Sequence, residues 1–166
     1  MKTLVTYFSD TGNTKKVAEA IFGEIGGEKE IKALSEIESL GGYDLTFVGF
    51  PIHAFAPPGP VKLFFQDKCK GRQLVLFMTH AQHEDFDELD GWLETCRNSA
   101  AGAELVGLFN CQGEILDSIL EAMSNNDDPY MQKLAKGAST SKGQPDDSRL
   151  ERARSFAREI MAKYAK

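Results

Sequence analysis

Short apolar runs alternate with helical patterns along the chain, and this alternation constrains the fold more than any other feature. The runs are about five residues long and rich in β-branched and aromatic side chains, as expected of strands. They span residues 4–7, 30–34, 45–50, 74–78 and 105–109. Repeated strand–helix units favour a parallel sheet with helices on both faces and right-handed crossovers. The sequence therefore predicts an α/β doubly wound, five-stranded parallel sheet.

The runs differ in polarity, and the difference predicts their places in the sheet. The first, third and fourth runs are apolar almost throughout, as expected of strands that are covered on both faces. In the second run, Ile31 and Leu34 stand among charged residues. We therefore expect the second strand to lie at an edge of the sheet.

Amphipathic patterns predict the helices between these runs. Val17, Ile21 and Ile25 recur every four residues, so the first helix buries one stripe. Ser35 and Glu38 have the spacing of a capping box, which predicts a short second helix. Apolar stripes predict three later helices, which begin near Pro60, near Phe86 and at Ser148.

Length and composition indicate one ordinary globular domain, which we expect to span 1–166. The 166 residues, 42% hydrophobic and 27% charged, correspond to about one domain. A formal net charge of −6 disfavours nucleic acid and anionic membranes as partners. The three cysteines form no C-x-x-C pair, and no apolar stretch approaches the roughly 20 residues of a membrane span. We expect a cytoplasmic protein.

Residues 114–144 do not follow the simple alternation. Segments 115–123 and 130–134 have helical patterns, whereas 139–144 is polar and contains glycine, which is typical of a mobile segment. We expect a helical and mobile insertion at about 114–144, which could act as a lid, as a partner surface or as a decoration of the fold without its own role.

A turn rich in hydroxyl and amide side chains separates the first run from the first helix. It reads Ser9, Asp10, Thr11, Gly12, Asn13 and Thr14. A helix N-terminus offers unpaired N–H groups and a partial positive charge, which together hold a phosphate. The spacing fits neither a Walker loop nor a dinucleotide-binding fingerprint, so a single terminal phosphate is favoured. Plain helix capping is the alternative, but it requires fewer polar residues.

This turn resembles the phosphate loop of the flavodoxin family. The residues that match the family's signature in order and spacing are Ser9, Gly12, Thr14, Ala18 and Ile21. Thr6 departs from it, because the family prefers an apolar residue there. The resemblance spans nearly the whole chain and implies a flavodoxin-like fold with strand order 2-1-3-4-5. It also implies that FMN binds non-covalently, with its phosphate in residues 9–14.

Two further loops are expected to meet the phosphate loop, because ligands of doubly wound sheets bind where the strand order reverses. The loop after the third run begins with Pro51, Ile52, His53, Ala54 and Phe55. Four prolines within 51–60 stiffen it. It resembles the ring-contacting loop of flavodoxin-like proteins, which makes His53 and Phe55 candidates to stack on the isoalloxazine. The alternative is a structural loop with Phe55 in the core.

The loop after the fourth run reads Thr79, His80, Ala81 and Gln82. It resembles the family's second ring loop by position only, because the tyrosine often found there is missing. His80, His83 or Phe86 would have to take its place.

All three histidines, His53, His80 and His83, lie in these two loops. Together with Glu84 or Asp85 they could hold zinc or iron. However, no Cys or carboxylate has a recognised ligand spacing, and FMN would occupy the same pocket, so no metal site is expected. A protonated histidine beside the flavin would raise its reduction potential.

Acidic residues crowd the start of the expected fourth helix. They are Glu84, Asp85, Asp87, Glu88 and Asp90. Acids stabilise the first turn of a helix, and this accounts for two or three of them. The others indicate a negative field that steers a basic redox partner toward the flavin. Both interpretations stay open.

Three functions follow as hypotheses. The first is an FMN-binding carrier that shuttles electrons between redox protein partners with a basic docking face and needs no catalytic side chain. The second is an FMN-dependent NAD(P)H:quinone or small-molecule reductase, which the lack of a basic cluster near the ring loops disfavours. The third is a module that has lost FMN. Cys111 is interpreted as a buried residue, and Cys69, Cys96 and Trp92 carry no functional signal.

Overall fold

The chain forms a five-stranded sheet in which all neighbouring strands are parallel. The computed structural model describes residues 1–164. Its strands are β1 (Lys2–Tyr7), β2 (Glu28–Ala33), β3 (Leu45–Pro51), β4 (Gln73–His80) and β5 (Glu104–Gln112). Their order is β2-β1-β3-β4-β5, which confirms the predicted fold and strand order.

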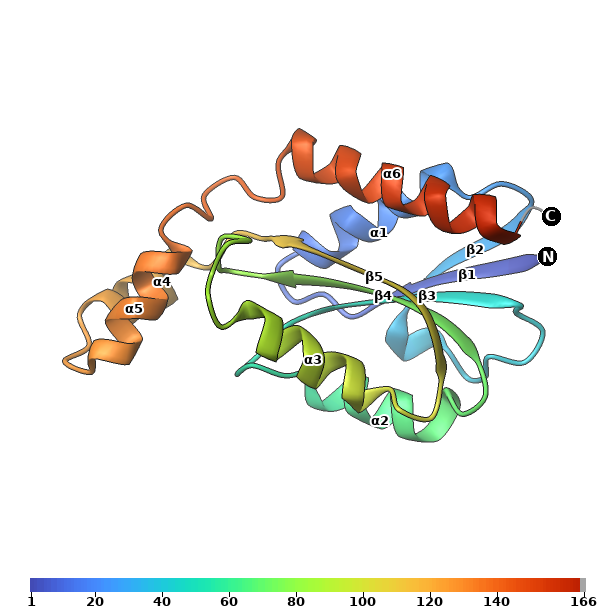
Figure 1. The fold of residues 1–166 in the computed structure, drawn as a ribbon, viewed down its shortest axis with the longest axis horizontal. Helices are drawn as coiled ribbons and strands as arrows, with labels where there is room; N and C mark the ends of the chain where they lie inside the picture. Colours follow the sequence, from blue (N-terminus) through green and yellow to red (C-terminus); the bar gives the residue numbers. More distant parts are fainter. Residues whose placement is uncertain (165–166) are drawn as a thin grey trace.

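Helices cover both faces of the sheet (Figure 1). They are α1 (Asn13–Glu24) and α6 (Asp147–Tyr164) on one face, and α2 (Gly59–Lys68) and α3 (Leu89–Ser99) on the other. Successive strand residues point to opposite faces, so Leu4 packs toward α2 and α3 whereas Val5 packs toward α1 and α6. Two apolar layers therefore hold the strands, and the strand ends are left to form loops.

The predicted second helix is wrong. After β2 the chain makes only a single 3₁₀ turn, Leu34–Glu36. The Glu36 carboxylate accepts a hydrogen bond from the Ala33 N–H at 2.7 Å, and Ile37 is already extended. Ile37 and Leu40 are buried in the core, so tertiary packing stops the helix that the Ser35–Glu38 spacing indicated.

The exposed edge at β2 carries a charged cluster that we call the edge triad: Lys32, Glu30 and Tyr43. Lys32 pairs with Glu30, and the Tyr43 hydroxyl donates to the same carboxylate at 2.8 Å. Hydrogen bonds from Lys2 and Lys32 lower the pKa of Glu30 to about 2. Charged side chains at a sheet edge discourage pairing with other chains.

The segment between β5 and α6 contains two helices, α4 (Asp117–Ser124) and α5 (Pro129–Ala138). They pack against each other as a helical hairpin beyond the carboxyl ends of the strands (Figure 1). Their positions agree with the expected helical segments. In the following stretch, Ser141 Oγ accepts from the Ile115 N–H at 3.3 Å, and the Gly143 N–H donates to Glu114 at 2.8 Å. The expected mobility of 139–144 stays a prediction.

Candidate functional site

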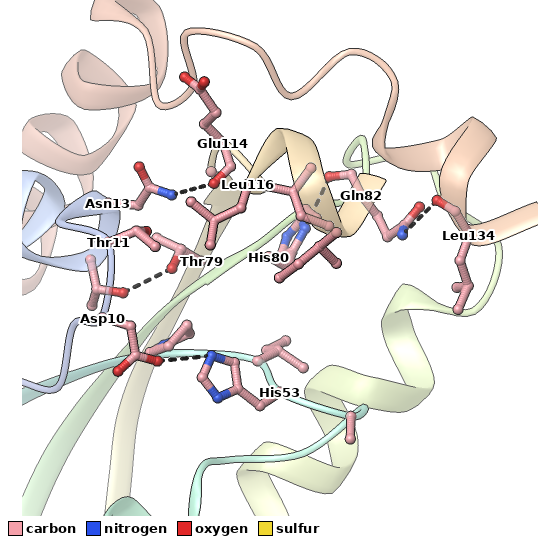
Figure 2. Close-up of a pocket in the computed structure, with 18 of the residues that line it drawn as sticks. Asp10, Thr11, Asn13, His53, Thr79, His80, Gln82, Glu114, Leu116 and Leu134 are labelled. Atoms are coloured by element: carbon pink, nitrogen blue, oxygen red, sulfur yellow. Dashed lines mark hydrogen bonds and ion pairs between the residues drawn. The ribbon is translucent and has the colours of Figure 1, made fainter. Parts of the chain in front are cut away.

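A cavity of about 560 Å³ opens at the carboxyl ends of β1, β3 and β4, where the strand order reverses (Figure 2). All the residues that the sequence predicts as cofactor ligands line it, except Gly12. They are Ser9, Asp10, Thr11, Asn13, Thr14, Pro51, Ile52, His53, Ala54, Phe55, Thr79, His80, Ala81 and Gln82. Three loops far apart in the sequence therefore meet in one place.

The first turn of α1 forms one end of this cavity. Gly12 precedes the helix with a φ of 95°, a conformation that glycine adopts without strain. Because glycine has no side chain, this residue cannot cap α1 itself. Ser9 Oγ accepts hydrogen bonds from the N–H groups of Gly12 at 3.2 Å and Lys15 at 3.3 Å. Because a hydroxyl also has one proton to donate, Ser9 can still donate to an anion.

Two side chains join this end to neighbouring loops. Thr14 is buried, and its hydroxyl lies 2.8 Å from the hydroxyl of Thr79 at the end of β4. Asn13 Nδ2 donates to the Glu114 carbonyl at 2.9 Å (Figure 2). The polar turn therefore does more than cap a helix, because it links β1 to the ends of β4 and β5.

The loop after β3 makes a tight turn at the mouth of the cavity. His53 and Ala56 exchange backbone hydrogen bonds of 2.9 and 3.1 Å around Ala54 and Phe55, whose φ values are 45° and 67°. Left-handed backbone costs roughly 1–2 kcal/mol for a residue with a Cβ, so this turn is held under strain. The Phe55 side chain is 40% exposed, and the alternative that placed it in the core is therefore wrong.

His53 connects this turn to residues 9–14. Its Nε2 lies 3.3 Å from Asp10 Oδ2, and both side chains are half exposed (Figure 2). The contact brings the loops after β1 and β3 together at the rim of the cavity.

His80 is buried below the cavity rather than free to stack beside it. Its Nδ1 lies 3.0 Å from the Gln82 carbonyl oxygen, and its Nε2 lies 2.9 Å from Oδ1 of Asn110 on β5. Burial lowers the pKa of His80, although both of its ring nitrogens face oxygens. A proton on Nδ1 donates to the Gln82 carbonyl and holds the loop 79–82 in place.

The opposite wall of the cavity comes from residues that sequence reasoning missed. Trp92 of α3 lines it, with its ring 4.9 Å from that of Phe55 and 5.4 Å from that of Phe86. The hairpin adds an apolar surface made of Ile115, Leu116, Ile119, Met123, Met131 and Leu134. The only sequence signals were the helical patterns of 115–123 and 130–134, which do not reveal what their apolar faces cover.

Comparison with known proteins decides the family. The family described as Flavodoxin domain matches residues 4–158, nearly the whole chain. The chain belongs to the flavodoxin family. This confirms the resemblance stated from the motif.

Individual relatives of this flavodoxin-family chain agree with that assignment. It is 28% identical over 173 residues to the flavodoxin-like domain-containing protein BilS of Clostridioides difficile (strain CD3), with 98% of each chain covered. A flavodoxin from the domain Archaea has a TM-score of 0.63 at 17% identity and full coverage of both chains. Oxidised Flavodoxin 2 from Bacillus cereus has a TM-score of 0.62 at 21% identity, covering 98% of this chain and 99% of that one. The structural similarities show the fold.

The residues at the cavity fit FMN, the cofactor that the flavodoxin family implies. At the polar end, the start of α1, where Gly12 gives no capping side chain, and the remaining proton of Ser9 suit a phosphate. At the other end, Phe55 and Trp92 offer aromatic faces to a planar ring, and apolar side chains surround them. The polar end therefore suits the phosphate of FMN, and the aromatic and apolar end suits its ring.

Most of the acidic cluster of this flavodoxin-family chain is paired within the molecule. Glu84 accepts two hydrogen bonds of 2.7 Å from Arg149 and one of 3.2 Å from Arg152. Burial alone would raise the pKa of Glu84, but the bonds from Arg149 and from the Gln112 N–H outweigh burial and lower it to about 2. Asp87 and Glu88 pair with Lys133 of α5. These three acids therefore anchor other segments.

The three cysteines of this family member are not reactive thiols. Cys69, Cys96 and Cys111 are buried free thiols, and burial raises the pKa of each to about 12. Such thiols are poor nucleophiles, as expected for Cys111.

Within residues 1–164, no three His, Cys, Asp or Glu side chains gather in a way that could hold a metal ion. In the same residues, no helix combines the length and apolarity needed to cross a membrane.

Proposed function

We propose that this chain binds FMN non-covalently and carries electrons between redox protein partners. The supporting observation is that one cavity joins a hydroxyl-rich helix N-terminus, at one end, to an aromatic and apolar chamber at the other. Bound FMN would supply the oxidation and reduction chemistry, and the protein would bind, orient and partly shield it.

In this proposal residues 9–14 hold the phosphate. The N–H groups in the first turn of α1 and the hydroxyls of Ser9 and Thr14 donate to its oxygens. For Thr14 this requires Thr79 to donate to Thr14 across their 2.8 Å contact, which leaves the Thr14 proton free. Binding of the phosphate would thereby fix the hydroxyl orientation of both Thr14 and Thr79, the latter at the end of β4.

The ring then lies between residues 51–55 and 79–82. Phe55 is the stacking candidate, since its side chain is exposed at the cavity mouth and next to Trp92. Backbone groups of 52–55 meet the polar edge of the ring. His80 acts as a positioning residue, because its Nδ1 holds the carbonyl of Gln82 in the second ring loop.

The physiological partner is proposed to be a redox protein with a basic docking face. The net charge of −6 favours this, and two acids of the cluster, Asp85 and Asp90, are exposed and have no ion-pair partner within residues 1–164. Electron transfer to such a partner should slow as salt rises. A rate that does not respond to salt would remove the electrostatic part of this proposal. The reduced thiols suit a cytoplasmic location.

The test is a visible absorption spectrum of freshly purified protein, followed by titration of the stripped protein with FMN. We expect a yellow protein and saturable binding at micromolar FMN or below. Steady-state oxidation of NAD(P)H by the pure protein with a quinone would instead favour the small-molecule reductase. A colourless protein that does not bind FMN would contradict both functions.

A further inference from the structure

The α4–α5 hairpin forms a wall of the cavity, although no phosphate or ring loop requires it. Its apolar inner surface faces the cavity, and Leu116 and Ile119 are still 52% and 47% exposed. Figure 2 places Leu116 across the cavity from His53. Exposed apolar side chains that line a cavity gain burial when an apolar ligand lies against them. The hairpin therefore has a surface suited to cover a ring.

Neutral hydrogen bonds hold the base of the hairpin. Gln82 Nε2 donates to the Leu134 carbonyl, and the His83 N–H donates to the Gly137 carbonyl, both at 3.1 Å. α5 lies so close here that a Cβ on Gly137 would be 1.9 Å from Gln82 Oε1 and 3.0 Å from the Phe86 ring. Gln82 also lines the cavity. The same residue therefore belongs to the second ring loop and to the contacts that hold α5 in place.

A separate set of contacts holds the outer side of α5, and we call it the latch: Lys133, Tyr130, Asp87 and Glu88. Lys133 Nζ lies 2.6 Å from Glu88 and 3.1 Å from Asp87. The Tyr130 hydroxyl donates to Glu88 at 2.7 Å. The Tyr130 ring also lies 6.1 Å from the ring of Phe55, so the latch reaches the turn at the cavity mouth.

We propose that the hairpin is a lid on the flavin site: its apolar face covers the ring, and the latch sets how fast FMN leaves. The inference rests on the proposed function, since it needs a bound flavin. The latch consists of exposed charges, which open and close at low cost, whereas the base is packed and buried. The lid therefore opens at the latch and stays attached at the base.

The test measures the rate of FMN dissociation from the full chain. Lys133→Met removes the latch charge but keeps an apolar stem against Phe86, and we expect dissociation to become about twofold to fivefold faster at low salt. The ratio of variant to wild-type rates should fall toward one as salt rises, because salt screens the latch in the wild type. Gly137→Ala, whose Cβ would clash with the side chain of Gln82 at the base of the hairpin, should speed release about tenfold.

The edge triad supplies a matched control. Lys32→Met removes a lysine that, like Lys133, pairs with a glutamate that also accepts from a tyrosine hydroxyl, but at the β2 edge of the sheet. FMN should leave this variant at the wild-type rate. Equal rates for wild type, Lys133→Met and Gly137→Ala, with FMN still bound, would overturn the lid and leave the proposed function standing. A wild-type chain that binds no FMN would overturn both.

Discussion

The two ends of the cavity are built in different ways. The polar end comes from residues 9–14, six consecutive residues whose geometry follows from one strand, one glycine and one helix start. The apolar end is assembled from α3, α4 and α5 together with the loop after β3. The proposed phosphate site is therefore local in sequence, whereas the proposed ring site depends on packing between distant segments.

The largest expected effect separates the two ends by ligand. The double variant Ser9→Ala with Thr14→Ala should weaken FMN binding about a hundredfold or more, because hydrogen bonds to a charged group contribute roughly 1.5–3 kcal/mol each. Riboflavin has the ring but no phosphate, so its affinity should change little. Titration of each stripped protein with both ligands measures this. Equal losses for FMN and riboflavin would remove the phosphate from residues 9–14.

A change at the apolar end should affect both ligands alike. Trp92→Ala removes the aromatic ring next to Phe55, and we expect FMN and riboflavin to lose affinity by the same factor, about tenfold. Trp92→Phe keeps an aromatic face and should recover most of the loss. An effect confined to FMN would show that Trp92 acts through the phosphate end.

The ion pair between Glu84 and Arg149, beside the second ring loop, should make the stability of the fold depend on pH. The pKa of Glu84 is about 2 in the folded chain and near 4.5 when unfolded, so its pairing stabilises the fold above pH 4.5 and is lost as pH falls toward 2. Glu84→Gln should therefore lower the free energy of unfolding by about 2–3 kcal/mol at pH 6. Denaturant unfolding at several pH values measures the difference. A difference that does not shrink below pH 4.5 would contradict the assignment.

The smallest effect concerns the strand that leads into the phosphate loop. Thr6 is fully buried in β1, and its hydroxyl has no hydrogen-bond partner within residues 1–164. Thr6→Val keeps the shape and removes the unpaired group, so it should stabilise the fold by about 1 kcal/mol in denaturant unfolding. Thr79→Val is the matched control and should destabilise, because it breaks the contact with Thr14. A loss of stability in Thr6→Val would mean that its hydroxyl is bonded.

Sequence patterns predicted the parts of the molecule that are local. The strands, their order and the edge position of β2 follow from apolar runs and from the family motif, and so do the three loops at the cavity. The Ser35 helix failed because burial of Ile37 and Leu40 outweighs a capping pattern. Trp92 was missed because only the packing of α3 against the loop after β3 turns it toward the cavity.

The acidic cluster also shows that contacts between distant residues cannot be predicted from local sequence patterns. From sequence, Glu84 and Glu88 are indistinguishable from the free acids beside them. Their partners, Arg149 and Lys133, lie 65 and 45 residues further along the chain. Long-range pairing therefore decides which charges of a cluster are left to meet another protein.

The burial of Cys69, Cys96 and Cys111 has a consequence for the proposed electron carrier. Thiol–disulfide exchange needs an accessible thiolate, and burial denies both access and ionisation to all three. Electrons held by the cofactor would meet no competing sulfur chemistry in this chain, and the protein should tolerate handling in air without forming cross-links.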